Sequence, residues 1–217
     1  MKITKKTSAF IIISFSAMLV FSSGCNLLTY PAYILFGQTH QSVKAEYRGL
    51  TGKKIAIVVA GQPAIEFEQP YARMDLALVS AQTVSDHVKK VTFADQDQID
   101  RFQRESLDWY SVSISEIARK FDAEVVLYID LIQFTTAEID SINLLRGRIW
   151  AQVSIYDMSA ANPDSPKYET EVQVIYPEQM PLPISDSASI AVRQNTLLMF
   201  ADELARKFYD HKKEIRK

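Results

Sequence analysis

The only cysteine of this 217-residue chain, Cys25, occupies a position at which its thiol can be acylated. It directly follows three small residues, Ser22-Ser23-Gly24, of the kind that a signal peptidase must admit. Upstream lie three lysines within the first six residues and a 13-residue apolar stretch over 9–21, the pattern of a secretory signal. That stretch is too short to span a bilayer core, which needs roughly 20 residues. We therefore expect cleavage after Gly24 and lipidation at Cys25.

Residues Ser22 to Cys25 resemble the lipobox of bacterial lipoproteins, with Ser22 where that family usually has Leu. The resemblance implies a signal peptide over residues 1–24, a diacylglycerol on the sulfur of Cys25 and a third acyl chain on its amine. Three chains would hold the protein on a membrane surface, since two already give stable anchoring. Asn26 follows the cysteine, and in the enterobacterial pattern the absence of Asp there favours the outer membrane. The resemblance implies a lipid-anchored envelope protein that faces the periplasm.

Residues 25–50 are expected to form a lipidated, membrane-proximal tether whose first part is strongly apolar. Tyr30, Tyr33 and Phe36 are the aromatic residues of this part. One interpretation is that they lie among the lipid headgroups, as interfacial aromatic residues do. The other is that the segment packs back on the folded domain, and the sequence leaves both open.

The charge balance argues against a nucleic-acid partner. The chain has 24 basic and 26 acidic residues, and removing residues 1–24 takes away three lysines and no acidic residue, which leaves a net charge near −5. A basic binding surface is not expected from such a balance. The length fits a single globular domain, expected over residues 51–210 and followed by a basic tail over 211–217 that frays.

Motifs for a cofactor or a metal are weak throughout the chain. The segment 49–54, GLTGKK, lacks the spacing of a phosphate loop and precedes a strand instead of following one. Asp95, Asp97 and Asp100 are spaced partly like a calcium loop, but Ile99 occupies a ligand-type position and no glycine supplies the bend. A helix start with favourable acidic residues explains them better. We expect no cofactor and no metal.

Catalytic motifs are also missing from the sequence. The three histidines, His40, His87 and His211, are far apart and none has a partner at metal-ligand spacing. There is no G-x-S-x-G elbow, and Cys25 is committed to the lipid. The sequence therefore favours a protein that is not an enzyme. Two alternatives stay open, an enzyme with a site of scattered carboxylates and hydroxyls, and a lipid carrier with an apolar cavity between helix and sheet.

Hydrophobic periodicity predicts the elements that would position a site. Period-two or continuous apolar runs predict strands over 53–60, 91–93, 125–134, 148–157 and 168–176. Apolar residues at spacings of three and four predict helices over 72–88, from Asp95 onward, after the capping box Ser113–Glu116, and over 187–209. This order predicts an α+β fold, with a single mixed, largely antiparallel sheet of about five strands and helices packed on one face.

The same order resembles the small α/β domain shared by the curli-secretion channel lipoprotein, the amino-terminal domain of the Tol-system β-propeller protein and the auxiliary lipoproteins of envelope transporters. The segments that carry the resemblance include KKIAIVVA at 53–60, IARKFDAEVVLYIDLIQF at 117–134 and RGRIWAQVSIYD at 146–157. It implies a non-catalytic protein that binds a partner in envelope transport, secretion or assembly. No unassigned pair of alternating segments remains that could form a membrane-spanning hairpin, so a pore is not expected.

Two aromatic residues are the best candidates for partner contacts. Trp150 and Tyr156 fall on the otherwise polar face of the strand 148–157, and aromatic residues on such a face are typical of interfaces. The competing explanation is burial beneath the terminal helix. Asp130, within an apolar strand, is expected to pair across strands with Arg146 or Arg148, or else to be a buried carboxylate that marks a site.

Overall fold

The fold is that of a computed structural model, which describes residues 40–214. Cys25, Tyr30, Tyr33 and Phe36, and with them the signal peptide and most of the tether, lie outside the described residues. Residues 43–211 form one compact unit, and the short strands next to its two ends form a separate two-stranded sheet.

Helices and strands follow the sequence pattern closely in the middle of the chain. The strands are β1 (His40–Val43), β2 (Lys54–Gly61), β3 (Thr92–Phe93), β4 (Val125–Glu138), β5 (Ser141–Asp157), β6 (Tyr168–Tyr176), β7 (Leu182–Pro183) and β8 (His211–Glu214). The helices are α3 (Pro63–Glu68), α4 (Ala72–His87), α5 (Gln96–Glu105), η1 (Trp109–Ser111), α6 (Ile114–Lys120) and α7 (Asp186–Arg206).

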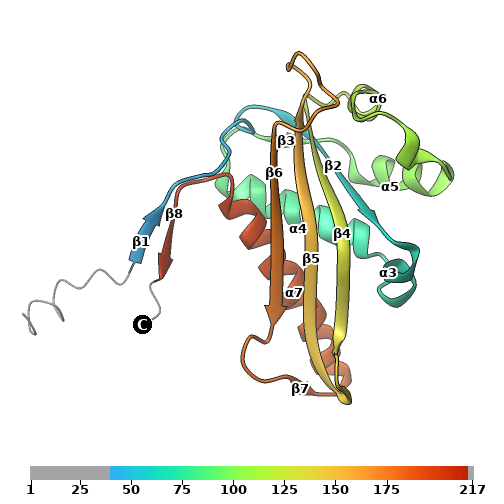
Figure 1. The fold of residues 1–217 in the computed structure, drawn as a ribbon, viewed down its shortest axis with the longest axis vertical. Helices are drawn as coiled ribbons and strands as arrows, with labels where there is room; N and C mark the ends of the chain where they lie inside the picture. Colours follow the sequence, from blue (N-terminus) through green and yellow to red (C-terminus); the bar gives the residue numbers. More distant parts are fainter. Residues whose placement is uncertain (1–39, 215–217) are drawn as a thin grey trace, which may run out of the picture. The chain divides into compact units, whose positions relative to one another are not determined.

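The main sheet has six strands, in the order β3-β2-β4-β5-β6 with β7 beside β5 (Figure 1). β2 pairs in parallel with β3 and β4, whereas β4, β5, β6 and β7 pair antiparallel. The predicted α+β class with a mixed sheet is confirmed, but the sheet is larger and more parallel than predicted. The extra strand is β7, which is only two residues long and follows a proline-rich segment that gives no strand signal.

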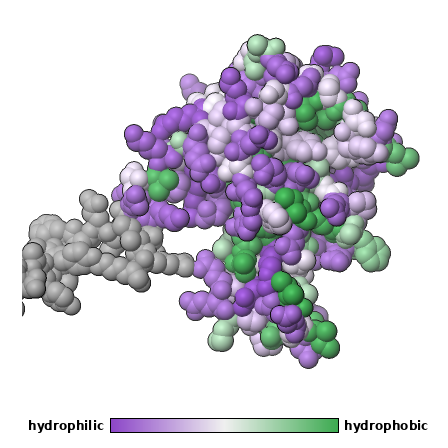
Figure 2. All heavy atoms as spheres, viewed as in Figure 1, coloured by the Kyte–Doolittle hydropathy of each residue, from purple (hydrophilic) through white to green (hydrophobic). Residues whose placement is uncertain are grey.

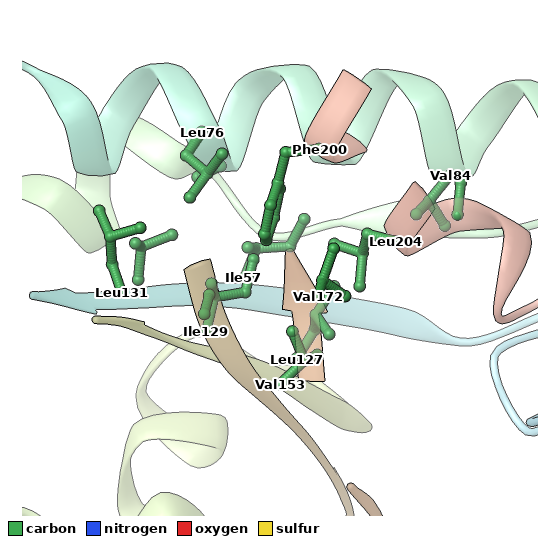
Figure 3. Packing of buried hydrophobic residues seen from close by; sticks show 14 of the residues in the cluster. Ile57, Leu76, Val84, Leu127, Ile129, Leu131, Val153, Val172, Phe200 and Leu204 are labelled. Carbon is green, nitrogen blue, oxygen red and sulfur yellow. The ribbon is translucent and has the colours of Figure 1, made fainter. Parts of the chain in front are cut away.

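One face of the sheet carries the larger core, which we call face A. Helices α4 and α7 pack on it, and alternate residues of β2, β4, β5 and β6 contribute its floor. Figure 3 shows Leu76 of α4 and Phe200 of α7 above Ile57 and Ile129 of the sheet, with no solvent-exposed side chain among them. Burial of these side chains contributes about 1.5–3 kcal/mol each, before entropy losses.

The opposite face, face B, is covered only in part. Helices α5 and α6 pack over β2 and the beginning of β4, where Ala56, Val58 and Val126 form a second cluster with Ile99 and Ile117. The prediction that helices pack on one face is therefore wrong. The physical reason is visible in β2, whose residues from Ile55 to Val59 are all buried, because a strand buried on both sides needs helices on both sides.

A β-bulge changes which residues of β4 face the core. Leu131 pairs with Ala151 and Gln133 with Trp150, so Ile132 is the extra residue on the bulged strand. After the bulge Phe134 lies in the face A core together with Leu131, although strict alternation would put these two on opposite faces.

Both predicted helix starts on face B are confirmed. The Ser113 side chain accepts a hydrogen bond from the backbone N–H of Glu116 and caps α6, and the Asp95 carboxylate accepts from the N–H groups of Asp97 and Gln98 and caps α5. Such caps satisfy backbone donors that the first helical turn leaves unpaired.

The chain segments at the two ends of the compact unit pair with each other. β1 and β8 form a two-stranded sheet, so residues 211–214 adopt a strand conformation where the sequence predicts a fraying tail. Among the residues that the structure describes, none of the helices has the length and apolar character needed to cross a bilayer.

Candidate functional site

The uncovered part of face B lies over β5, β6 and the second half of β4, and we call it the open face. Trp150 is at its centre, with Gln133 of β4 and Gln173 of β6 as its cross-strand neighbours. Three large apolar side chains are exposed on it, with exposed fractions of 36% for Trp150, 37% for Ile132 and 44% for Ile175. Hydrophobic residues gather in the middle and lower part of the face drawn in Figure 2, between hydrophilic areas.

The terminal helix does not cover Trp150. Helix α7 packs on face A, where it approaches the sheet so closely that a Cβ atom on Gly147 would lie 1.8 Å from Oγ1 of Thr196. Trp150 is an odd number of residues from Gly147 along the same strand, so its side chain points to the opposite face. Of the two explanations for this residue, burial beneath the terminal helix is excluded.

Tyr156 contributes to a different feature, a cavity of about 410 Å³ at the junction of α6 and the sheet, which we call the aromatic pocket. Four of the nine residues that line it are aromatic. The lining comprises Trp109, Tyr110, Val112, Ser113, Ile114, Ile117, Tyr128, Tyr156 and Asp164. Trp109 is the buried ring of the pocket, whereas Tyr110 is largely exposed at 71%.

Polar groups of the pocket include the hydroxyls of three tyrosines and of Ser113 and the carboxylate of Asp164. Burial raises the pKa of Tyr128 to about 12, and the charge of Asp130 and the nearby Tyr156 add to this shift. The phenol therefore stays neutral over the physiological pH range. Asp164 lies at the N-terminus of α6, where it accepts hydrogen bonds from the backbone N–H of Ser115 at 2.7 Å and from its hydroxyl at 3.0 Å.

The two predicted partner residues therefore lie on the same face of β5 but not in the same site. Six residues at about 3.3 Å each separate them by roughly 20 Å. Sequence reasoning missed Trp109 and Tyr128, which complete the pocket around Tyr156. The signal for Trp109 was its position next to Tyr110 just before the capping box, but nothing in the sequence links that segment to β4 and β5.

The expectation for Asp130 is wrong in both of its forms. Asp130 is exposed on the open face, and Arg146 and Arg148 bind Glu138 instead, at 3.1 Å and 2.5 Å. The backbone N–H of Ile139 and the Arg148 guanidinium lower the pKa of the Glu138 carboxyl. The reason is geometric, because the hairpin between β4 and β5 extends to residues 138–141 and its end places Glu138 beside both arginines.

The acidic residues at the start of α5 have structural roles. Asp95 caps the helix, and Asp100 forms an ion pair with Arg104 at 2.8 Å. Among residues 40–214, no group of three or more histidine, cysteine, aspartate or glutamate side chains could hold a metal ion. The His87 ring stacks on Tyr209 with centroids 4.1 Å apart, so this histidine has a packing role.

Comparison with known proteins gives only distant structural likeness. No family model matches the chain, and no curated protein matches it. The PelC dodecamer of Paraburkholderia phytofirmans aligns at a TM-score of 0.45 and 12% identity, over 79% of this chain and 98% of that one. The lipoprotein GNA1162 of Neisseria meningitidis aligns at a TM-score of 0.43 and 13% identity, over 69% of this chain and 98% of that one. The hypothetical protein CT253 of Chlamydia trachomatis aligns at a TM-score of 0.43 and 12% identity, over 72% of this chain and 97% of that one.

TM-scores below 0.5 at such identities do not establish a common function, so nothing about this chain follows from the names of those proteins. The resemblance to curli-secretion, Tol-system and transporter lipoproteins stays a prediction.

Proposed function

We propose that this chain is a non-catalytic, lipid-anchored envelope protein whose open face binds a protein partner in transport, secretion or assembly. The observation that carries the proposal is Trp150, a large aromatic side chain that is 36% exposed at the centre of a sheet face that helices leave bare. Tryptophan surrounded by aliphatic and polar side chains is the typical composition of an interface hot spot.

The surroundings of Trp150 suit a partner with a folded surface. Ile175 is its diagonal neighbour on β6, because it pairs with Arg148 while Trp150 pairs with Gln173. Glu169 and Glu171 follow along the same face of β6 and are exposed. An apolar centre with a polar rim fits recognition of another protein better than contact with hydrocarbon, in which charged carboxylates would be costly.

The membrane attachment in this proposal rests on the sequence around Cys25. A lone cysteine behind a charged segment, an apolar stretch and three small residues has the pattern of a lipidation site. Anchoring would keep the open face close to the membrane surface and raise the effective concentration of a membrane-bound partner. The preference for the outer membrane rests on Asn26 alone.

The lipid-carrier alternative needs an apolar cavity between helix and sheet. That interface is filled, since Leu76, Ile57 and Phe200 are at most 1% exposed and pack together. The enzyme alternative needs a base next to a hydroxyl. The Ser115 hydroxyl donates to Asp164, but this carboxylate also accepts from the backbone N–H of Ser115 and so has a structural role at the start of α6. The rings of His87 and His211 contact Tyr209 and not this hydroxyl. These observations favour binding over either alternative.

The proposal is tested by capture of partners from detergent-solubilised envelopes. The intact protein is compared with Trp150→Ala, and with Phe67→Ala as the matched control, because Phe67 is an exposed aromatic residue of α3 outside the open face. We expect Trp150→Ala to reduce recovery of the specific partner at least tenfold, as loss of a hot-spot residue costs about 2 kcal/mol or more, and Phe67→Ala to leave it unchanged. Equal recovery with all three proteins would overturn the proposal.

A further inference from the structure

We propose that the aromatic pocket receives the cationic end of an arginine or lysine side chain of the protein partner. This inference rests on the proposed partner binding and adds to it the chemistry of one contact. The pocket lies between η1, α6, β4 and β5, on the same side of the sheet as the open face.

The walls of the pocket favour a cation. Trp109, Tyr110, Tyr128 and Tyr156 supply four rings to one cavity, and the rings of Trp109 and Tyr110 meet edge to face with centroids 6.5 Å apart. A ring carries negative charge density on its face, so an ammonium or guanidinium group is attracted to it, most strongly to Trp. Val112, Ile114 and Ile117 give an apolar wall for the aliphatic stem of such a side chain.

The charge of the pocket points the same way. Asp164 is the only charged residue of its lining, which contains no lysine or arginine. Asp130, two residues from Tyr128 on the same strand, adds a second negative charge nearby. The start of α6 does not make this an anion site, because Asp164 and the Ser113 hydroxyl already accept from the N–H groups of Ser115 and Glu116.

Free hydrogen-bond acceptors favour a side chain with N–H groups. The hydroxyls of Tyr128 and Tyr156 make no hydrogen bond to any residue in the range 40–214, so each can accept from a guanidinium or ammonium group. A quaternary ammonium headgroup of a lipid has no N–H to donate and would leave these acceptors unused. Trp150 is roughly 20 Å away along β5, and only a partner of protein size could contact both.

The test uses the full lipidated protein in dodecyl maltoside, a detergent without an ammonium group. The chain has two tryptophans, so a nitrogen–proton correlation spectrum has two indole signals, and the Trp150→Phe variant identifies the signal of Trp109. The probe is Nα-acetyl-arginine amide. Nα-acetyl-citrulline amide has nearly the same shape without the charge, and choline represents the lipid headgroup.

We expect the arginine derivative to shift the Trp109 signal saturably, with a dissociation constant on the order of 1 mM, and to leave the Trp150 signal in place. Citrulline should bind roughly tenfold more weakly. Tyr156→Phe keeps the ring but loses the accepting hydroxyl and should bind about threefold more weakly than the native protein, whereas Tyr156→Leu should lose roughly tenfold. Asp164→Asn, whose amide oxygen can still accept from Ser115, should bind several-fold more weakly.

Equal binding of the arginine and citrulline derivatives would overturn the assignment of a cation. Tighter binding of choline than of the arginine derivative would overturn the assignment to a protein side chain. Native affinity in both Tyr156→Leu and Asp164→Asn would exclude this pocket. Because the probe needs no partner, these outcomes are separate from loss of partner capture in Trp150→Ala, which tests the proposed function itself.

Discussion

Gly147 is a residue at which the sheet and the last helix approach each other closely. A Cβ atom there would lie 1.8 Å from Oγ1 and 2.8 Å from Cβ of Thr196, a buried residue of α7 whose hydroxyl donates to the Val192 carbonyl. No side chain larger than hydrogen fits without displacing the helix. The close approach holds α7 on face A, the side of the sheet opposite the open face.

We predict that Gly147→Ala lowers the free energy of unfolding by about 1–3 kcal/mol, because overpacking forces the helix away from the sheet. The matched control is Gly61→Ala on β2, where the new Cβ would meet its nearest atom at 3.6 Å, an ordinary contact. Urea unfolding of the two variants measures the difference. Equal stability of both variants would contradict the packing described for α7.

Glu46 provides a pH-dependent contact close to the N-terminal end of the compact unit. Its carboxylate accepts from Lys207 Nζ at 2.7 Å and from the Tyr168 hydroxyl at 2.6 Å, and these bonds lower the pKa of Glu46 below its usual 4.5. A carboxyl whose pKa is lower in the folded state stabilises the fold above the unfolded pKa. This contribution is lost as the pH falls through the lower, folded value.

We therefore predict that Glu46→Gln destabilises the protein at pH 7 and has progressively less effect as the pH falls from 7 through the lowered pKa of the folded Glu46 carboxyl. The free energy of unfolding, measured over that range, should fall less steeply with acidification in the variant. Glu105→Gln is the control, since Glu105 makes no ion pair or hydrogen bond with the described residues. Parallel curves for native protein and Glu46→Gln would show that the contact is not formed.

At the scale of elements, the acidic residues at the start of α5 can be tested as a helix cap against a calcium-binding loop. The Asp95 carboxylate accepts from the N–H of Asp97 at 3.0 Å. We predict that Asp95→Ala costs about 1 kcal/mol while Asp95→Asn, which can still cap, costs little. Melting temperatures should be the same with calcium and with a chelator. A rise with calcium that Asp95→Asn abolishes would instead identify a calcium site.

Helices, strands and caps that depend on residues close together in the chain could be predicted from the sequence. The periodicity of α4 and β6 and the caps at Asp95 and Ser113 each depend on residues within a few positions of one another. The two-sided cover of the sheet was also present in the sequence, as the continuous apolar run of β2, but the prediction of helices on one face did not use it.

Features that depend on distant pairing could not be predicted. The bulge at Ile132 shifts the register of β4 against β5 and so changes which side chains of β4 point to face A. β1 pairs with β8, a strand about 170 residues later in the chain. The aromatic pocket combines η1, α6, β4 and β5 with Asp164 from the loop before β6. Trp109 and Tyr128 meet there through the tertiary fold alone, so the sequence could single out Tyr156 but not its neighbours.

At the scale of the whole molecule, lipidation decides where the domain acts. We predict that Cys25→Ser leaves an unprocessed precursor, because the resemblance to lipoproteins makes acylation the step that precedes cleavage. Mass spectrometry of the native protein should find three acyl chains on a new N-terminal Cys25. A mature protein with an unmodified thiol at that position would contradict the anchor.

Site-specific photo-cross-linking in intact cells is the sharpest test of whether a protein partner covers the open face. A photoreactive amino acid replaces Ile175 on the open face or, as control, Phe67 on α3. We predict a discrete cross-linked protein from position 175 whose yield falls when Trp150→Ala is added, and none from position 67. The same product from both positions, with a yield that Trp150→Ala does not change, would show that no partner binds the open face through Trp150.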